Sequence, residues 1–166
     1  MSAMNDSPDK AAISQLQSLS RGLAGAVICL GILVLFGWGV DSPTLKTVMP
    51  GFASMKANTA VCFLLLGLSL GHRESPKAAA ALPALAALIA VATLTEYAAR
   101  LDLGIDQLFF SDEGGPETSH PGRMSPVTAL AFILAASGLL APCIKKSCVK
   151  PGQTLLLGAA LLGLAS

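Results

Sequence analysis

The chain has 166 residues, of which 53% are hydrophobic and only 13% charged, and its formal net charge is +1. Average soluble domains carry roughly 25% charged residues, so this composition argues against a soluble fold and indicates a membrane protein. The near-neutral balance, with no basic run, gives no indication of a nucleic-acid partner.

The N-terminal end of the chain is polar up to residue 21, and an apolar run follows at 23–40. That run is too long for the hydrophobic part of a signal peptide and has no obvious small-residue cleavage site, so it indicates an uncleaved anchor. Trp38, near the end of the run, is typical of the membrane–water interface. We therefore expect a cytosolic tail at 1–21 and a membrane domain at 22–166.

Four more apolar runs follow the first. A helix rises about 1.5 Å per residue, so about twenty residues cross a hydrocarbon core of about 30 Å. Because every backbone polar group must be satisfied within the lipid, all five runs are expected to be helices. The last run ends at 166 after fourteen residues, and we expect a truncated helix at the front of a longer protein. The expected spans after the first are 57–71, 78–99, 126–144 and 153–166.

One sequence pattern occurs twice. Residues 49–68 read MPGFASMKANTAVCFLLLGL, and residues 120–139 read HPGRMSPVTALAFILAASGL. From Met55 and Met124 onward the copies match at a constant spacing of 69 residues. Each copy leads a turn-forming stretch into an apolar run, and such a repeat sets the architecture. We expect an all-α, polytopic helical membrane protein with two repeated helical hairpins and a fifth, truncated membrane helix.

Lysine and arginine are unevenly divided between the two ends of the expected hairpins. Seven fall on the side of the N-terminus and of the short links near 72–77 and 145–150, and four fall on the other side. Because positive charge favours the cytoplasmic side, we expect the N-terminus in the cytoplasm and the connections 41–56 and 100–125 outside. Both copies of the repeat then lie on the outward side, in hairpins related by an axis near the membrane normal.

The residues at the two helix starts of the repeat could cap the helices or bind an anion. Ser125 before Pro126 is typical of an N-cap followed by the first helical residue, and Asn58 or Thr59 can cap the first copy. Helix N-termini favour anions, and basic side chains lie close to both starts. The acidic loop 100–125 leaves an anion pocket, loop salt bridges and a purely structural role all open. The candidate sensing residues here are Lys56, Asn58, Thr59, His120, Arg123 and Thr128.

Glu96 lies near the outward end of the third apolar run, and ionisable groups at that depth are candidates for a functional role. Arg100 follows four residues later on the same helical face, and we expect the two to form a structural ion pair. The GIDQLFF segment that follows is expected to be a short amphipathic stretch in the interface, with Ile105, Leu108 and Phe109 toward lipid.

The sequence contains no catalytic motif such as H-E-x-x-H, G-x-S-x-G or a P-loop. No two carboxylates have a spacing that predicts a pair inside the membrane, and the four scattered cysteines form neither a disulfide framework nor a metal-ligand pattern. We therefore expect no enzyme activity in this stretch, no metal and no cofactor.

The motifs P-G-x-M-x-P-x-T-A-L-x-F, at 121–132, and G-I-D-Q-L-F, at 104–109, resemble those of the multi-pass N-terminal membrane regions of some bacterial signalling proteins. In that family the membrane region precedes PAS, histidine kinase or GGDEF (diguanylate cyclase) modules. The resemblance covers residues 23–144 and brings no catalytic residue to this chain. Val127 departs from the pattern, which often has Asn there, whereas Asn58 keeps it in the first copy.

The resemblance implies a sensory input region in the bacterial inner membrane, which relays a periplasmic or membrane-borne cue to an output module outside this chain. It also implies a homodimer. Besides the lipid bilayer, the expected partner is a small ligand of unknown identity. A fragment of a small-solute transporter, in which parallel repeats also occur, and a passive membrane anchor remain as alternatives.

Overall fold

The computed structural model describes residues 7–47, 54–112, 114, 120–145 and 148–165. Over these residues the regular secondary structure is helical, and no strand occurs among them, so the expected all-α fold is confirmed. The helices are α1 (Ser7–Gly39), α2 (Pro43–Lys46), α3 (Ala57–Gly71), α4 (Pro76–Ala99), α5 (Pro126–Ile144) and α6 (Val149–Ala165).

The helix bounds follow the apolar runs of the sequence. α3 and α5 begin and end at the expected residues, and α4 and α6 begin slightly before their expected starts. Ser75 caps α4 by accepting a hydrogen bond from the Ala78 N–H, with Pro76 at the first helical position. α1 extends back to Ser7 because no Gly or Pro interrupts residues 9–21, so the expected tail is largely helical and continuous with the first span.

Three helical stretches of the described chain are long and apolar enough to cross a membrane: Ser14–Gly39 within α1, α4 and α5. The chain is therefore a helical membrane protein. α3 has 15 residues and α6 has 17, so a full crossing by these two stays a prediction. At about 1.5 Å per residue α3 is about 22 Å long, against roughly 30 Å for a hydrocarbon core.

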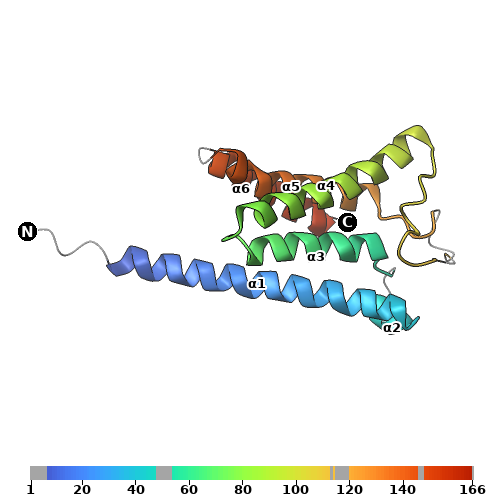
Figure 1. The fold of residues 1–166 in the computed structure, drawn as a ribbon, viewed down its shortest axis with the longest axis horizontal. Coiled ribbons are helices and arrows are strands. Elements are labelled where there is room, and N and C mark those ends of the chain that lie inside the picture. The colour runs from blue at the N-terminus through green and yellow to red at the C-terminus, as the bar shows by residue number, and fades with distance from the viewer. Residues whose placement is uncertain (1–6, 48–53, 113, 115–119, 146–147, 166) are drawn as a thin grey trace, which may run out of the picture.

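The helices form two hairpins with antiparallel arms, followed by α6 (Figure 1). α1 packs on α3, α4 packs on α5, α3 and α4 join the two hairpins, and α6 packs on α5. α2 and the described part of the 100–125 connection lie at one end of the bundle, opposite the start of α1 and the turn between α3 and α4 (Figure 1). The described parts of both long connections thus lie at the same end, as the sequence repeat predicted.

Alanine side chains occupy many of the contacts between the helices. Small residues of this kind allow helix backbones to approach closely in lipid, where van der Waals packing drives association. The alanines without exposed surface are Ala60, Ala86, Ala90, Ala129 and Ala136.

The two hairpins meet at corresponding positions of the repeat. The rings of Phe63 in α3 and Phe132 in α5 contact edge to face, with centroids 5.1 Å apart. These residues are 69 positions apart, so each is the counterpart of the other. Contact between equivalent residues is typical of two units that are related by a two-fold axis. The two copies of the sequence repeat therefore also occupy corresponding positions in the structure.

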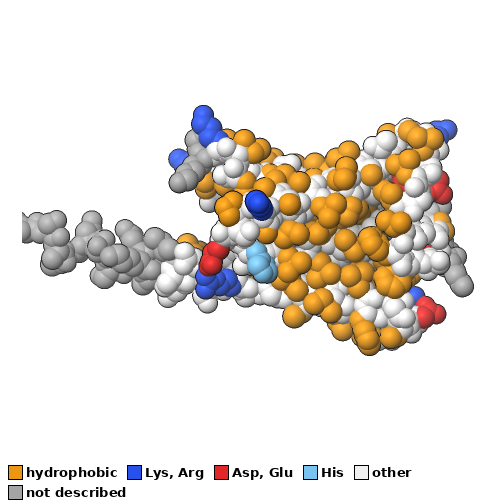
Figure 2. Space-filling view, in the orientation of Figure 1, with side chains coloured by type: hydrophobic (Ala, Val, Ile, Leu, Met, Phe, Trp, Pro, Cys, Tyr) orange, Lys and Arg blue, Asp and Glu red, His pale blue; other side chains and the backbone are white. Residues whose placement is uncertain are grey.

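Hydrophobic side chains cover the middle of the bundle, whereas charged side chains gather at its two ends (Figure 2). The exposed large apolar residues include Ile32 and Phe36 of α1 and Leu88 and Val91 of α4. An exposed apolar surface of this extent is the surface that lipid covers in a membrane protein. This surface fits a bilayer crossed by the three long apolar helices, with the polar ends of the bundle toward the headgroups.

The close packing of α1 on α3 depends on Gly31. A Cβ at this position would lie 2.7 Å from Leu64 Cγ and 2.9 Å from the Ala60 carbonyl oxygen. We expect Gly31→Ala to lower the free energy of unfolding by about 1–3 kcal/mol, because the backbone oxygen cannot move aside cheaply. Gly25→Ala, in the same helix with nothing within 4 Å of the new Cβ, is the matched control. Thermal unfolding in one detergent measures both variants, and equal midpoints would contradict the close contact.

Candidate functional site

The two helix starts of the repeat have the same backbone geometry. Lys56 and Ser125, 69 residues apart, precede α3 and α5 with φ/ψ of −70°/149° and −64°/152°. Ser125 is the expected N-cap, since its Oγ accepts the Thr128 N–H at 3.1 Å and lies 2.8 Å from Thr128 Oγ1. Lys56 occupies the equivalent position but makes no side-chain cap bond, so the second start is capped and the first is not.

The expected capping of the first copy by Asn58 or Thr59 is wrong. α3 begins at Ala57, so Asn58 is the second helical residue rather than the residue before the helix. Its Oδ1 nevertheless accepts the Thr59 N–H at 2.8 Å, which satisfies one of the free amides of the first turn. Its amide nitrogen, Nδ2, takes no part in this contact and donates to another residue.

An aromatic donor of the preceding helix fixes each start. Trp38 Nε1 of α1 donates to the Met55 carbonyl oxygen at 2.9 Å, and the Tyr97 hydroxyl of α4 donates to the Met124 carbonyl oxygen at 3.2 Å. Met55 and Met124 are counterparts in the repeat. The two hairpins therefore close the same end of the bundle in the same way, although the sequence places different aromatic residues there.

Arg123 is the centre of the polar end of the bundle. Its Nε donates to Asp106 Oδ2 at 2.5 Å and lies 3.4 Å from Glu96 Oε2, while its Nη2 donates to the Leu101 carbonyl oxygen at 3.4 Å. The side chains of Arg123 and Asp106 are 8% and 5% exposed, and that of Glu96 is 0% exposed. A guanidinium that is buried with two carboxylates is held by strong, charge-assisted hydrogen bonds.

The expected ion pair between Glu96 and Arg100 is wrong. Arg100 ends α4 in the left-handed region, with φ 53°, so it has left the helical spacing that would place it over Glu96. Its side chain has no ion pair among the described residues, and Glu96 pairs with Arg123 instead. Glu96 Oε1 also accepts the Leu103 N–H at 2.8 Å, whereas Oε2 has no hydrogen-bond partner in the described chain.

Asp106 connects the two hairpins. Its Oδ2 accepts from Arg123, just before α5, and its Oδ1 accepts from Asn58 Nδ2 in α3 at 3.3 Å. The first copy of the repeat therefore contributes an amide, and the second contributes a guanidinium, to one carboxylate. We call Arg123, Glu96, Asp106 and Asn58 the Arg123 cluster. Two carboxylates share one guanidinium in it, an association that the sequence analysis did not predict.

A second link lies beside this cluster. Lys56 Nζ donates to Asp112 Oδ2 at 2.7 Å, and the same oxygen accepts the Gly122 N–H at 2.7 Å. Asp112 Oδ1 accepts the Gly114 N–H at 3.1 Å. The Lys56 and Asp112 side chains are both largely buried. Asp112 therefore holds its own loop in shape while it attaches that loop to the start of α3.

These contacts shift the pKa values of two groups in the polar end. Burial alone would raise the pKa of Asp112, but the hydrogen bonds from Lys56, Gly122 and Gly114 outweigh burial and lower it. Burial alone would lower the pKa of Arg123, but its hydrogen bond and charge interaction with Asp106 raise it. Both groups are therefore held in their charged forms.

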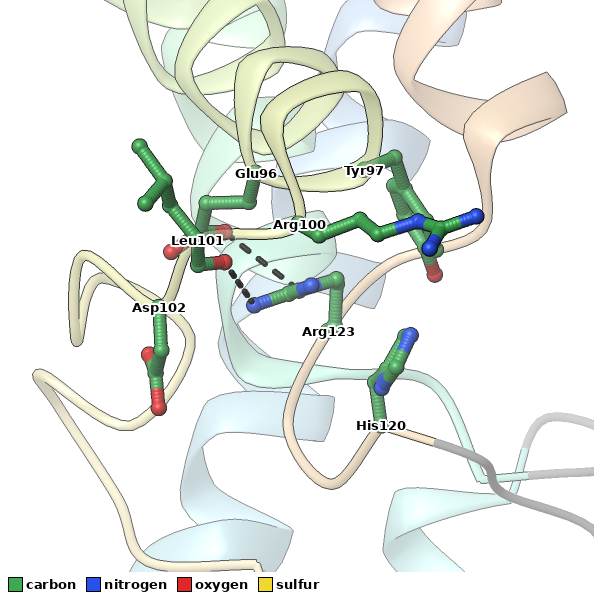
Figure 3. Close-up of a pocket in the computed structure, with 7 residues that line it drawn as sticks. All are labelled: Glu96, Tyr97, Arg100, Leu101, Asp102, His120 and Arg123. Carbon is green, nitrogen blue, oxygen red and sulfur yellow. Dashed lines mark hydrogen bonds and ion pairs between the residues drawn. The ribbon is translucent and has the colours of Figure 1, made fainter.

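A cleft of about 490 Å³ opens beside the cluster (Figure 3). The Tyr97 ring forms one wall, with its centroid 5.4 Å from that of His120 and 5.2 Å from Arg123 Cζ. Side chains of both charge signs therefore border an aromatic surface in this cleft. The lining residues are Glu96, Tyr97, Arg100, Leu101, Asp102, His120 and Arg123.

The segment that contains GIDQLFF is not a helix. Residues 101–112 are turns, bends and irregular backbone, because inward hydrogen bonds of the chain replace helical ones. Ile105 is half-buried, whereas Leu108 and Phe109 are exposed. The expected amphipathic stretch is thus an irregular segment with a polar inner side and an apolar outer side.

The structure divides the expected sensing residues into three groups. Glu96, Arg100, His120 and Arg123 line the cleft, whereas Lys56 and Asn58 reach the same polar end through Asp112 and Asp106. Thr59 and Thr128 take part in helix-start hydrogen bonds and do not line the cleft.

Three further residues of this end were not among the expected ones: Asp106, Asp112 and Tyr97. The acidic character of the 100–125 loop was a signal for both aspartates, and Asp106 also lies in the G-I-D-Q-L-F motif. For Tyr97, the signal in the sequence was its position directly after Glu96.

The fold and the site define a class: a polytopic helical membrane protein with two hairpin repeats and a buried charge cluster at one end. Comparison of the chain with protein-family models, with curated proteins and with solved structures finds no match.

The role of Asn58 can be tested with its repeat counterpart, Val127. We expect Asn58→Val to lower the free energy of unfolding by about 1–3 kcal/mol, because Asp106 loses a buried donor and the Thr59 N–H loses an acceptor. Val127→Asn, at an exposed position, is the matched control and should change it by less than about 0.5 kcal/mol. Chemical denaturation in detergent measures both, and similar effects would contradict the assigned contacts.

The lowered pKa of Asp112 predicts a pH dependence. Its contacts stabilise the fold fully above the ordinary value of 3.8 and lose that effect as the pH falls through the lower, folded-state value. The midpoint difference between the parent and Asp112→Asn should therefore be constant above about pH 5 and shrink below about pH 4. Asp102→Asn, at an exposed aspartate of the same loop, is the control. A parent–Asp112→Asn difference that persists unchanged at about pH 2 would contradict the assignment.

Proposed function

We propose that this chain is the membrane-embedded sensory input module of a bacterial signalling protein. It lies in the inner membrane with the N-terminus in the cytoplasm, and it relays a periplasmic or membrane-borne cue to an output module outside these residues. The excess of Lys and Arg on the N-terminal side and the likeness of the repeat motifs to such membrane regions support this orientation and role.

The observation that carries the proposal is the position of the Arg123 cluster. It joins Asn58 of the first hairpin to Arg123 and Glu96 of the second, and it borders an open cleft. A ligand or local change that altered the partners of Arg123 would act on the contact between the hairpins. A buried charge network is suited to such a switch, because leaving either carboxylate without its cation is costly.

The relay would use the helices themselves. The start of α1 and the turn between α3 and α4 lie at the end of the bundle opposite the cluster (Figure 1). A shift of one hairpin against the other would therefore be transmitted to the cytoplasmic side as a helix movement. A homodimer follows only from the likeness to the signalling family. The proposal assigns no reaction to this stretch.

A transporter fragment is the alternative from a different class. Parallel hairpin repeats occur there too, together with broken helices near the bilayer midplane. α4 continues through Pro83 and α5 through Pro142, so neither described helix is interrupted at its proline. Flux of labelled solutes into proteoliposomes would favour the transporter, whereas regulated output from a following module would favour the sensor.

The sensor proposal is tested on the full-length protein in native membranes. We expect Arg123→Lys and Glu96→Gln each to change the kinase or diguanylate cyclase output by roughly 2- to 30-fold, which corresponds to about 0.5–2 kcal/mol of coupling. Lysine keeps the charge of Arg123 but not its planar set of donors. Arg73→Lys, at the exposed opposite end, is the matched control and should leave the output unchanged.

Membrane amounts and thermal midpoints of all variants must be measured in parallel, so that misfolding is not read as signalling. Unchanged output in folded Arg123→Lys and Glu96→Gln proteins would refute the role of the cluster. A full-length chain with further membrane spans and no output module would refute the sensor itself.

A further inference from the structure

Residues 101–110, which we call the strap, form a two-sided segment at the polar end of the bundle. Asp106 points inward to Arg123 and Asn58 and is buried. The large apolar side chains point the other way: Leu101, Leu103, Leu108 and Phe109 are 53%, 52%, 69% and 53% exposed. Exposing four large apolar side chains to water within these ten residues would be costly, so we expect another molecule to cover them.

The length of α3 sets the depth of the strap. Arg73 and Glu74 follow this helix and are exposed, and Glu74 lies 3.9 Å from Arg21, so this end of α3 lies at a polar boundary. The 15 residues of α3 extend about 22 Å from there, roughly 8 Å short of the far edge of a 30 Å hydrocarbon core. Any tilt shortens this reach further. The first turn of α3 therefore extends no farther out than the opposite acyl–headgroup boundary.

The strap is attached to that shallow end. Asp106 Oδ1 lies 3.3 Å from Asn58 Nδ2, in the first turn of α3. α4, with 24 residues, is about 36 Å long and exceeds α3 by nine residues. After Ala99 the chain turns back along α4, since the Leu103 N–H donates to Glu96 Oε1 at 2.8 Å before Asp106 meets the start of α3. This return brings the apolar side chains of the strap to the depth of the acyl–headgroup boundary.

We propose that the outer side of the strap inserts into the acyl–headgroup boundary of the bilayer, so that lipid is its cover. α4, which leads into the strap, also exposes large apolar side chains, among them Leu85, Leu88 and Val91. Irregular backbone is not tolerated in the hydrocarbon centre but is tolerated at the boundary, where water reaches its polar groups. The exposed Asp102 and Gln107 fit that depth, since they can reach the headgroups.

Tryptophan scanning in vesicles of phosphatidylcholine tests the insertion. Leu108→Trp and Phe109→Trp are made separately, and the signal of the parent, which has one tryptophan, is subtracted. Lipids brominated near the start of the acyl chain should quench each added tryptophan about twofold or more, as expected for side chains buried about 5–10 Å into the boundary. Ser111→Trp, at an exposed polar position just after the strap, is the matched control and should be quenched less.

Both substituted positions are exposed, so a tryptophan adds no core clash, and an unchanged thermal midpoint checks the fold. Emission typical of tryptophan in water, with quenching no greater than at Ser111, would overturn the proposal. Burial without quenching by brominated lipid would overturn it as well, because it would mean that a second copy or another protein covers the strap. The test is independent of any signalling output.

Discussion

A single buried guanidinium determines how the two hairpins meet at their polar end. Arg123 serves Asp106, Glu96 and the Leu101 carbonyl oxygen, and Asp106 in turn holds Asn58 of the other hairpin. Removing the cation would leave two largely buried carboxylates without their shared partner, and burying charge without a partner is costly. The contacts among the loop, the end of α4 and the start of α3 therefore meet at this one side chain.

The repeat explains why these groups converge. Two hairpins of like design, each closed by an aromatic donor to a methionine carbonyl, meet at the counterpart residues Phe63 and Phe132. The two copies of the repeat differ at the polar positions of their helix starts. The first has Lys56 and Asn58, and the second has Ser125 and Val127 at the same positions. A symmetric scaffold thus carries an asymmetric polar cluster, in which each copy supplies a different functional group.

The sequence was sufficient for the helices and insufficient for the cluster. The bounds of α3 and α5 follow from apolar runs and from Ser-Pro at the second start, all of which are local signals. The partner of Glu96 was misassigned because helical spacing was extended to Arg100, where the backbone has already turned into the left-handed region. Asp106 and Asp112 reach their partners through an irregular loop, and no periodic pattern encodes such a path.

The unequal helix lengths have a mechanical consequence. A bundle that combines a 15-residue helix with a 24-residue neighbour cannot match one bilayer thickness along both. α3 has no exposed residue from 57 to 70, so the surrounding lipid meets the longer helices, and α4 must tilt or extend past the hydrocarbon, at a cost of fractions of a kcal/mol for each ångström of hydrophobic mismatch. α4 carries Glu96, which pairs with Arg123. A change in membrane thickness that altered the tilt of α4 would therefore act on the polar cluster through Glu96.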